Sequence, residues 1–314
     1  FTEEKFWPLD VTYFVTFDNK KYDLNFIYYL LSKLELPSLA KGMKPGINRN
    51  EVYSINAKIP PLHEQKRIVA ILDEAFESIA KAKESAEKNL KNANEIFESY
   101  LQSVFENKGE GWEEKKLGDV CSLITDGKHG DCKNEENSGY YFLSAKDVKN
   151  NTLEYENARQ ITKADFEETH RRTDLKPGDV LVTNSGTIGR MAIAPLDEKT
   201  LKTTFQKSVA IIKPISTIIN NIFCCYHLKA DLSKLVNVSA GTAQKNLLLG
   251  DLRSHLISIP SLNEQQSIVS KLDALSQETK KLESIYTQKL ADLEELKKSI
   301  LQKAFKGELI EASV

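Results

Sequence analysis

The chain has 314 residues, of which 28% are charged and 40% are hydrophobic, and its formal net charge is −2. This length accommodates two small domains with connecting segments, and a nearly neutral charge carries no signature of nucleic-acid binding by itself. Apolar runs stay shorter than the roughly eighteen residues needed to span a bilayer. The four cysteines are too few and too irregularly spaced for a disulfide framework or a zinc site. We therefore expect a protein of the reducing cytoplasm.

The first part of the chain, residues 1–58, is predicted to be the C-terminal part of a first globular domain. Residues 39–60 align with residues 238–260 with one gap, which places Gly42 opposite Gly241. Upstream, residues 11–17 are strand-like and residues 25–33 are helix-like. The front of this first domain is therefore expected to be missing from the sequence.

Residues 59–110 predict one long helix, a first spacer. Apolar residues recur at steps of three and four from Ile68 to Val104, which is the pattern of one stripe along a helix. Pro60 and Pro61 forbid helix just upstream. Gly109 and Gly111 follow the last apolar position and are predicted to end the helix.

Residues 111–258 have a different texture and predict a mixed α/β globular domain of ordinary size. Short β-type runs occur at 180–183, 191–194 and 208–212, and they are separated by Gly- and Asp-containing turns. Helices are predicted at 163–170 and 218–234.

Residues 259–314 predict a second spacer helix, which repeats the first. The run IPPLHEQKRIVAILD at 59–73 recurs as IPSLNEQQSIVSKLD at 259–273, with nine of the fifteen residues identical. The register then continues without a gap to the end of each copy, and Gly307 is predicted to end the second helix. Because loops tolerate insertions, a gapless repeat indicates that the spacing itself is constrained.

The two spacer helices are predicted to pack against one another, because neither can bury its apolar stripe alone. Both copies depart from a strict seven-residue repeat at the same place, with Leu90 and Leu290 one position late. The predicted interface consists of Ile68, Leu72, Ile79, Leu90, Phe97, Leu101, Ile268, Leu272, Leu275, Leu282, Leu290, Leu293 and Ile300. An ordinary scaffold coiled coil explains the stripes equally well.

Signatures of catalysis are not found in the sequence. It contains neither a phosphate-binding loop nor a glycine-rich dinucleotide fingerprint. The five histidines do not fall near cysteine or acid at metal-ligand spacing. Asn184-Ser185-Gly186 does not meet the Gly-x-Ser-x-Gly pattern of a nucleophile elbow. We expect neither a catalytic site nor a bound metal.

The doubled run Pro-x-Leu-x-Glu-Gln-x-x-Ile-Val-x-x-Leu-Asp, each time followed by a long helix, resembles the specificity subunit of type I restriction–modification enzymes. So do GWEEKKLGDVCSLITDGKHGD at 111–131, GDVLVTNSGTIGRMAI at 178–193, FQKSVAIIKP at 205–214 and GTAQKNLLLGDL at 241–252. The resemblance covers essentially the whole chain. It departs from the family in one respect, since the first recognition domain is represented only by its C-terminal part.

The resemblance implies α/β (α+β) globular target-recognition domains joined by two long helices packed as an antiparallel coiled coil. It implies a non-catalytic subunit that reads a bipartite target in double-stranded DNA. Two modification subunits, which bind S-adenosylmethionine and methylate adenine, and restriction subunits, which consume ATP, are the implied partners. This chain is expected to bind no cofactor itself. The alternative is a coiled-coil adaptor whose globular domains bind protein rather than DNA.

Positive charge is locally segregated in three stretches of the second domain, 184–190, 199–213 and 232–250. Glycine allows close backbone approach to phosphate, Lys, Ser and Thr position a duplex, and Arg, Asn and Gln read base edges. The candidate DNA-binding residues are Lys128, His129, Arg171, Arg172, Asn184, Ser185, Gly186, Thr187, Arg190, Gln206, Lys207, Thr242, Gln244 and Lys245, with Lys44, Asn48 and Arg49 in the first domain.

Several of these candidates also have an ordinary structural explanation. The 184–190 stretch fits a tight turn between strands, and the lysines of 199–213 fit the solvent face of a strand. Arg171 and Arg172 lie close to acidic residues in sequence and fit a surface salt-bridge cluster. A loop histidine such as His129 is more often incidental than base-reading.

The repeat generates a test of spacing. A helix of about 43 residues is about 65 Å long at roughly 1.5 Å per residue, and a matched pair of that length would act as a ruler. Inserting four residues, about one helical turn, into the first spacer should lengthen the gap between the two half-sites without altering either half. Methylation maps that show an unchanged gap would refute the ruler.

Overall fold

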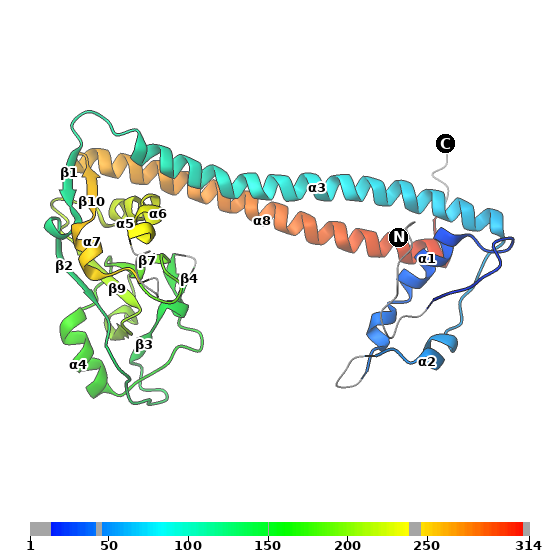
Figure 1. Cartoon of the computed structure of the whole chain (residues 1–314), viewed down its shortest axis with the longest axis horizontal. Helices are drawn as coiled ribbons and strands as arrows, with labels where there is room; N and C mark the ends of the chain where they lie inside the picture. The colour runs from blue at the N-terminus through cyan, green and yellow to red at the C-terminus, as the bar shows by residue number, and fades with distance from the viewer. Residues whose placement is uncertain (1–13, 42–45, 150, 239–245, 310–314) are drawn as a thin grey trace. The chain divides into compact units, whose positions relative to one another are not determined.

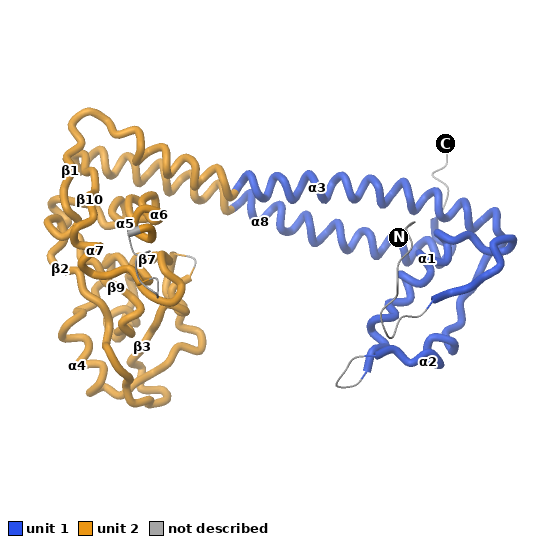
Figure 2. Tube along the Cα trace, in the orientation of Figure 1, with its two compact units in different colours: residues 1–93, 281–314 blue, residues 94–280 orange. Residues whose placement is uncertain are grey.

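The computed structural model describes residues 14–41, 46–149, 151–238 and 246–309. It divides into two compact units, Phe1–Ala93 with Lys281–Val314 (unit 1) and Asn94–Lys280 (unit 2), shown in blue and orange in Figure 2. Each long helix therefore contributes one part to each unit. Among the described residues, every helix is too short or too polar to span a membrane.

The two spacers form the long helices α3 (Leu62–Glu106) and α8 (Leu262–Lys306), each of 45 residues (Figure 1). Both helices were predicted. Their starts follow the predicted proline signals, and α8 ends as expected at Gly307, whose φ is +77°. The amide of Glu308 donates to the carbonyl of Lys303 at 3.0 Å, which satisfies a carbonyl of the last helical turn. α3 ends at Glu106, before the first predicted glycine.

The long helices pack antiparallel, as predicted. In unit 1 the start of α3, at Ile68 and Leu72, shares a core with Ala304 near the end of α8. In unit 2 the end of α3, at Leu101, shares a core with Leu272 near the start of α8. Further along unit 1, Lys83 and Glu294 form an ion pair of 2.6 Å between the two helices. Each helix thus buries its stripe against the other.

The predicted interface residues differ in burial. Ile68, Leu72, Ile79, Leu101 and Leu272 are buried, and Leu90, Phe97, Ile268, Leu275, Leu290, Leu293 and Ile300 are half-buried. Leu282, by contrast, is 37% exposed, so its assignment to the buried stripe is wrong. The buried residue in this part of α8 is Thr279, whose hydroxyl donates to the carbonyl of Leu275 at 3.0 Å. That internal bond lets a polar residue take an apolar position.

Unit 2 is built on a four-stranded antiparallel sheet. Its order is β2 (Cys121–Asp126), β9 (Val209–Pro214), β6 (Val180–Thr183) and β7 (Met191–Ile193). Side chains along β6 alternate between two cores, with Val180 and Val182 in one and Leu181 in the other. α5 (Asn221–Ala230) covers the first face and packs on β6, β7 and β9.

Smaller elements complete unit 2 (Figure 1). Strand β1 pairs antiparallel with β10, β3 parallel with β8, and β4 antiparallel with β5. The bounds of these elements are Glu113–Lys116 (β1), Tyr141–Leu143 (β3), Val148–Lys149 (β4), Thr152–Leu153 (β5), Lys163–Thr173 (α4), Thr203–Phe205 (β8), Leu232–Val238 (α6), Leu249–Ser254 (α7) and Leu256–Ile259 (β10). The strands predicted at 180–183, 191–194 and 208–212 and the helix predicted at 163–170 are confirmed with small shifts of boundary.

The helix predicted at 218–234 is two helices, α5 and α6, separated at Asp231. The side chain of Asn220 caps the start of α5 by accepting from the amides of Ile222 and Phe223. Asp231 turns its carboxylate toward His227, Lys234 and His255. His227 and Lys234 belong to α5 and α6, and only His255 lies outside the two helices, so Asp231 joins both helices to a more distant segment at the position of the break.

In unit 1, α1 (Leu24–Lys33) confirms the predicted helix, and α2 is a short helix at Arg49–Tyr53. The strand predicted at 11–17 is wrong for residues 14–17, which have no regular structure, while 11–13 lie outside the described residues. The described part of unit 1 contains no sheet. The missing cover is visible at equivalent positions of the two short helices, one residue before Tyr29 and Tyr226. Tyr28 of α1 is 47% exposed, whereas Cys225 of α5, beneath the sheet of unit 2, is 4% exposed.

The centre of α3 generates a prediction. Ala86 and Ala93 are 1% and 2% exposed, so the space around them accommodates only a methyl group. Ala86→Leu should destabilise the helix pair by about 1–3 kcal/mol through overpacking, whereas Ala80→Leu, on the exposed side of the same helix, should not. Thermal melts followed by helical circular dichroism measure the difference, and equal melting temperatures would contradict this packing.

Candidate nucleic-acid interface

The three positively charged stretches meet at the backbone of one residue, Asn184, just beyond strand β6. The amide of Asn184 donates to the carbonyl of Ser208 at 3.0 Å. The carbonyl of Asn184 accepts from the amide of Leu247 at 2.9 Å. Residue 184 belongs to the first stretch, 208 to the second and 247 to the third. Segments separated by more than twenty residues in sequence therefore share one edge of the domain.

The first of these stretches is the hairpin turn between β6 and β7. The amides of Gly189 and Arg190 donate to the carbonyl and hydroxyl of Thr183, both at 2.9 Å. Gly186 and Gly189 have φ values of +74° and +88°, a region that favours glycine. The tight-turn explanation of 184–190 is thus correct, and the turn leaves Thr187 and Arg190 exposed.

A fourth segment, the loop after β2, lies against the second stretch. The amide of Lys128 donates to the carbonyl of Phe205 at 2.7 Å, and the amide of Lys207 donates to the carbonyl of Lys128 at 3.0 Å. Gly127 is required for this approach, since a Cβ there would lie 1.9 Å from the carbonyl oxygen of Phe205. Gln206 is half-buried at this crossing and Lys207 is exposed.

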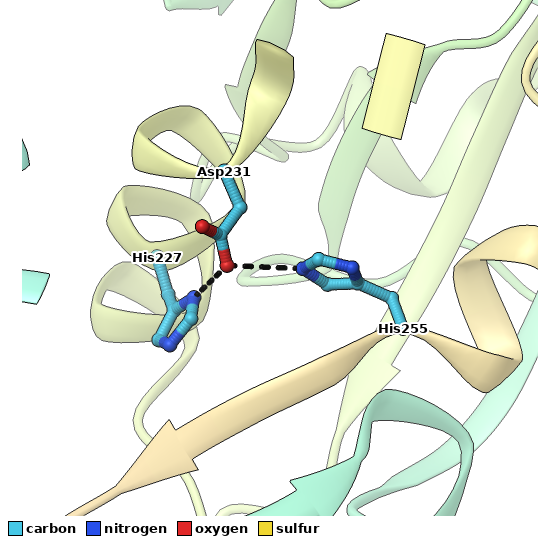
Figure 3. Close-up of side chains that lie close together, drawn as sticks. All are labelled: His227, Asp231 and His255. Atoms are coloured by element: carbon cyan, nitrogen blue, oxygen red, sulfur yellow. Dashed lines mark hydrogen bonds and ion pairs between the residues drawn. The ribbon is translucent and has the colours of Figure 1, made fainter. Parts of the chain in front are cut away.

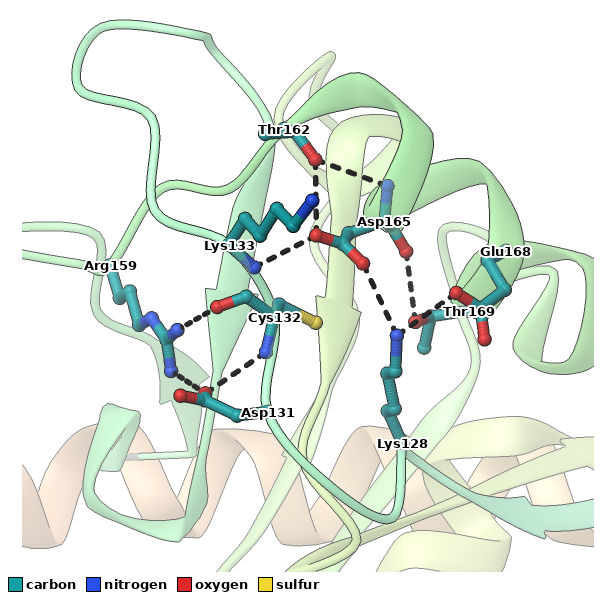
Figure 4. A network of polar contacts seen from close by, with 9 residues as sticks. All are labelled: Lys128, Asp131, Cys132, Lys133, Arg159, Thr162, Asp165, Glu168 and Thr169. Carbon is teal, nitrogen blue, oxygen red and sulfur yellow. Dashed lines mark hydrogen bonds and ion pairs between the residues drawn. The ribbon is translucent and has the colours of Figure 1, made fainter.

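The ammonium of Lys128 is engaged inside the domain rather than presented to a ligand (Figure 4). It lies 3.0 Å from Glu168 Oε2 and 3.3 Å from Asp165 Oδ1, both on α4. Its side chain is only 18% exposed. The hydrogen bond to Glu168 is the main reason why the pKa of Lys128 is raised. Its assignment to DNA contact is therefore corrected to a structural role.

Figure 4 also shows what holds the continuation of this loop. The Arg159 guanidinium binds the Asp131 carboxylate at 2.5 Å and the carbonyl of Cys132, and the amide of Lys133 donates to Asp165 at 2.8 Å. The hydrogen bond from Arg159 lowers the pKa of Asp131. Loop 126–133 is thus fastened to α4 and to the strand-like segment around Arg159.

The remaining candidates near α4 are also partly occupied. Arg172 donates to the carboxylate of Asp126 at 2.8 Å and to the carbonyls of Asp126 and Gly127, so it too serves the fold. His129 is exposed, and its Nε2 lies 3.1 Å from Asp126 Oδ2. Arg171 is exposed but borders a hollow that it shares with Glu167, Glu168 and Asp174, where an anion is disfavoured.

Exposed cationic and small polar groups on the shared edge therefore reduce to a short set. They are Gly186, Thr187, Arg190 and Lys207, while Ser185 and Gln206 are half-buried and Asn184 is buried. Asn184 is 7% exposed, and its Oδ1 has no hydrogen-bond partner among the described residues. Thr242, Gln244 and Lys245 lie outside the described residues, as does Lys44.

In unit 1, the remaining candidates have local roles. The Asn48 side chain accepts from the amide of Asn50 at 2.9 Å and caps α2. The Arg49 guanidinium lies 5.8 Å from the ring centre of Tyr53, one turn further along that helix. Both side chains are exposed.

His227, Asp231 and His255 come together in unit 2 (Figure 3), contrary to the expectation that no histidine falls near an acid at metal-ligand spacing. The signal was the four-residue spacing of His227 and Asp231, which places both on one helix face. His227 Nδ1 and His255 Nε2 lie 3.2 and 3.1 Å from Asp231 Oδ2. Burial alone would raise the pKa of Asp231, but hydrogen bonds from the two imidazoles and from Lys234 hold the pKa well below its usual value.

The chemistry of this trio does not fit a metal site. The amide of Ser258 donates to His227 Nε2 at 3.0 Å, so a neutral ring carries its proton on Nδ1, where a cation would need a lone pair. Lys234 Nζ lies 2.5 Å from Asp231 Oδ1 and supplies the positive charge instead. The trio fastens α5 and α6 to β10.

Sequence reasoning missed the residues that join the loops, Ser208 and Leu247. Both residues contribute backbone hydrogen bonds, which do not depend on a particular side chain, so a sequence pattern cannot predict them. The segregation of charge was the available signal, and it located the segments but not their junction.

Comparison with known proteins gives a consistent result. Residues 1–90 and 109–294 match the family described as type I restriction modification DNA specificity domain. The EcoBI specificity subunit of Escherichia coli is 25% identical, with the match covering 92% of this chain and 66% of that protein. The putative MjaX specificity subunit of Methanocaldococcus jannaschii is 24% identical over 93% and 69% of the two chains. This chain spans about two thirds of the length of such relatives.

Solved structures show the same fold. A chain from a study of complex assembly and conformational transition in a type I restriction–modification system superposes with a TM-score of 0.76 at 23% identity. The match covers 93% of this chain and 73% of that one. The HsdS subunit of Thermoanaerobacter tengcongensis superposes with a TM-score of 0.58, also at 23% identity, over 93% and 72%. With more than half of its residues matched, the chain belongs to the type I restriction modification DNA specificity family.

Proposed function

We propose that this chain is the DNA-sequence recognition subunit of a type I restriction–modification complex, and that the edge of unit 2 around Asn184 contacts one half of a bipartite target. Membership of the specificity family supports the first part. The convergence of three acid-poor stretches on the backbone of Asn184 supports the second. The family match gives no support to the alternative of a protein adaptor that does not bind DNA.

The chemistry of the edge suits a phosphate backbone. Arg190 and Lys207 are exposed there, and neither has an ion-pair partner among the described residues. Gly186 in the turn is exposed and has open space beside its Cα, which allows close approach of a ligand to the backbone. Cations and small hydroxyls of this kind position a duplex, while amide side chains such as Gln206 and Gln244 are of the type that reads adenine.

The proposal assigns chemistry to partners rather than to this chain. Two modification subunits would bind S-adenosylmethionine and methylate adenine, and restriction subunits would consume ATP. The specificity subunit would supply DNA recognition without catalysis and would work in the cytoplasm. Unit 1, through the exposed Asn48 and Arg49, would take part in reading the second half.

The first test concerns affinity for DNA. In complex with its modification subunit, Arg190→Ala and Lys207→Ala should each weaken DNA binding several-fold and reduce the slope of log K against log salt by about 1, because each removes a phosphate contact. Fluorescence anisotropy titrations at several salt concentrations measure both quantities. Lys271→Ala, an exposed position on α8, is the control. Salt slopes identical to wild type in both variants would count against this edge as the interface.

A second test separates interface lysines from structural ones. Lys128→Met should lower the free energy of unfolding of unit 2 by about 1–2 kcal/mol, because Asp165 and Glu168 lose their shared partner in a half-buried setting. Lys207→Met should leave stability unchanged and reduce DNA affinity. Urea unfolding followed by the fluorescence of Trp112, in a Trp7→Phe background that removes the other tryptophan, reports on unit 2. The reverse pattern of stabilities would show that the two roles are misassigned.

A further inference from the structure

Each long helix begins with a buried glutamine. Gln65 in α3 is 1% exposed and Gln265 in α8 is 0% exposed. Glutamine is ordinarily a surface residue, and burying its amide is unfavourable unless both ends are hydrogen-bonded. The two residues occupy the same place in the repeated Leu-x-Glu-Gln run.

In unit 2, the Gln265 amide joins three segments of backbone. Its Oε1 accepts from the amide of Asn220 at 2.7 Å, just before α5. Its Nε2 donates to the carbonyl of Ile218 at 3.1 Å and to the carbonyl of Pro260 at 2.9 Å. One side chain therefore ties the loop before α5 and the end of β10 to the first turn of α8.

In unit 1, Gln65 makes the same three bonds in different surroundings. Its Oε1 accepts from the amide of Asp23 at 2.9 Å, just before α1. Its Nε2 donates to the carbonyls of Lys21 at 3.0 Å and Pro60 at 2.8 Å. The sheet that covers α5 has no counterpart among the described residues of unit 1, yet the bonds are reproduced. The geometry of this contact is therefore independent of that sheet.

A second polar contact accompanies each glutamine two turns along the helix. The Tyr226 hydroxyl donates to Asp273 at 2.6 Å in unit 2, and the Tyr29 hydroxyl donates to Asp73 at 2.5 Å in unit 1. Two contacts about 12 Å apart along one helix, at roughly 1.5 Å per residue, hold the angle between two rods as well as their separation.

In each unit the short helix also makes an aromatic contact with the other long helix, the one that does not carry the buried glutamine. The rings of Phe223 and Phe105 lie 5.4 Å apart in unit 2, and those of Phe26 and Phe305 lie 5.1 Å apart in unit 1. The short helix thus carries the pattern Asp/Asn-x-x-Phe-x-x-Tyr, at 23–29 and at 220–226. Its first residue caps the helix, its phenylalanine meets one long helix and its tyrosine meets the other.

We propose that Gln65 and Gln265 are positioning residues that set the angle at which each recognition domain stands on the helix pair, and so set the gap between half-sites that the subunit accepts. This inference rests on the proposed function. A methionine would fill the same volume without any of the three bonds. A glutamate would keep the acceptor and place a second oxygen against two carbonyls.

The experiment compares Gln265→Met and Gln265→Glu with Gln277→Met, an exposed glutamine on the same helix. Target duplexes are built from the sequence obtained by mapping methylated adenines, with the native gap or with one base pair added or removed. In complex with the modification subunits, both Gln265 variants should lose at least several-fold of the preference for the native gap. Gln277→Met should keep the wild-type ratio.

The preference ratio distinguishes positioning from a general loss of stability. A variant that binds all duplexes more weakly by one common factor would overturn the proposal, because only stability would then have changed. Gln65→Met supplies the same test at the other end if the Gln265 variants fail to fold.

Amide hydrogen exchange separates this inference from the proposed function. Exchange at Asn220 should quicken in Gln265→Met, which removes the acceptor of this amide, and not in Gln277→Met. Unchanged exchange in Gln265→Met would overturn the proposal. Wild-type complex that binds none of the duplexes would refute DNA recognition, while the exchange at Asn220 would still decide whether the glutamine holds the domain.

Discussion

The structure depends on one constraint, that neither long helix can bury its apolar stripe without the other. A solitary helix of 45 residues with a continuous stripe would leave Leu72, Ile79, Ala86 and Ala93 in water. Antiparallel pairing of α3 with α8 removes these side chains from solvent. It also places the start of one helix beside the end of the other in each unit, and this is where the globular elements are attached.

The attachment uses polar contacts of high directionality on top of apolar packing. Apolar surfaces alone allow a domain to slide or rotate, because burial depends on area rather than on direction. The amides of Gln65 and Gln265 and the tyrosine–aspartate pairs remove that freedom, since their bonds form only over a narrow range of angles. Under the proposed function, each recognition domain must be held at a fixed angle to the helix pair, and directional contacts of this kind fix such an angle.

The candidate interface shows the same division between packing and presentation. Loop 126–133 is held in place by hydrogen bonds from three cationic side chains, Lys128, Arg159 and Arg172. Arg190 and Lys207 stand on backbone that is fixed by hydrogen bonds at Thr183, Asn184 and Lys128, and their charges face outward. A rigid backbone beneath exposed cations lowers the entropic cost of binding.

The sequence by itself determined the two long helices, their pairing and the α/β character of 111–258, because periodicity and an ungapped repeat can be read without coordinates. Its motifs also carried the resemblance to the specificity family. Charge segregation also located the stretches that hold Asn184, Arg190 and Lys207. Only the tertiary structure decided that Lys128 and Arg172 pair with acidic residues of their own domain, that the helix predicted at 218–234 breaks at Asp231, and that Leu282 is exposed. Each of these depends on which residues lie close together in space, and a pattern along the sequence does not show that.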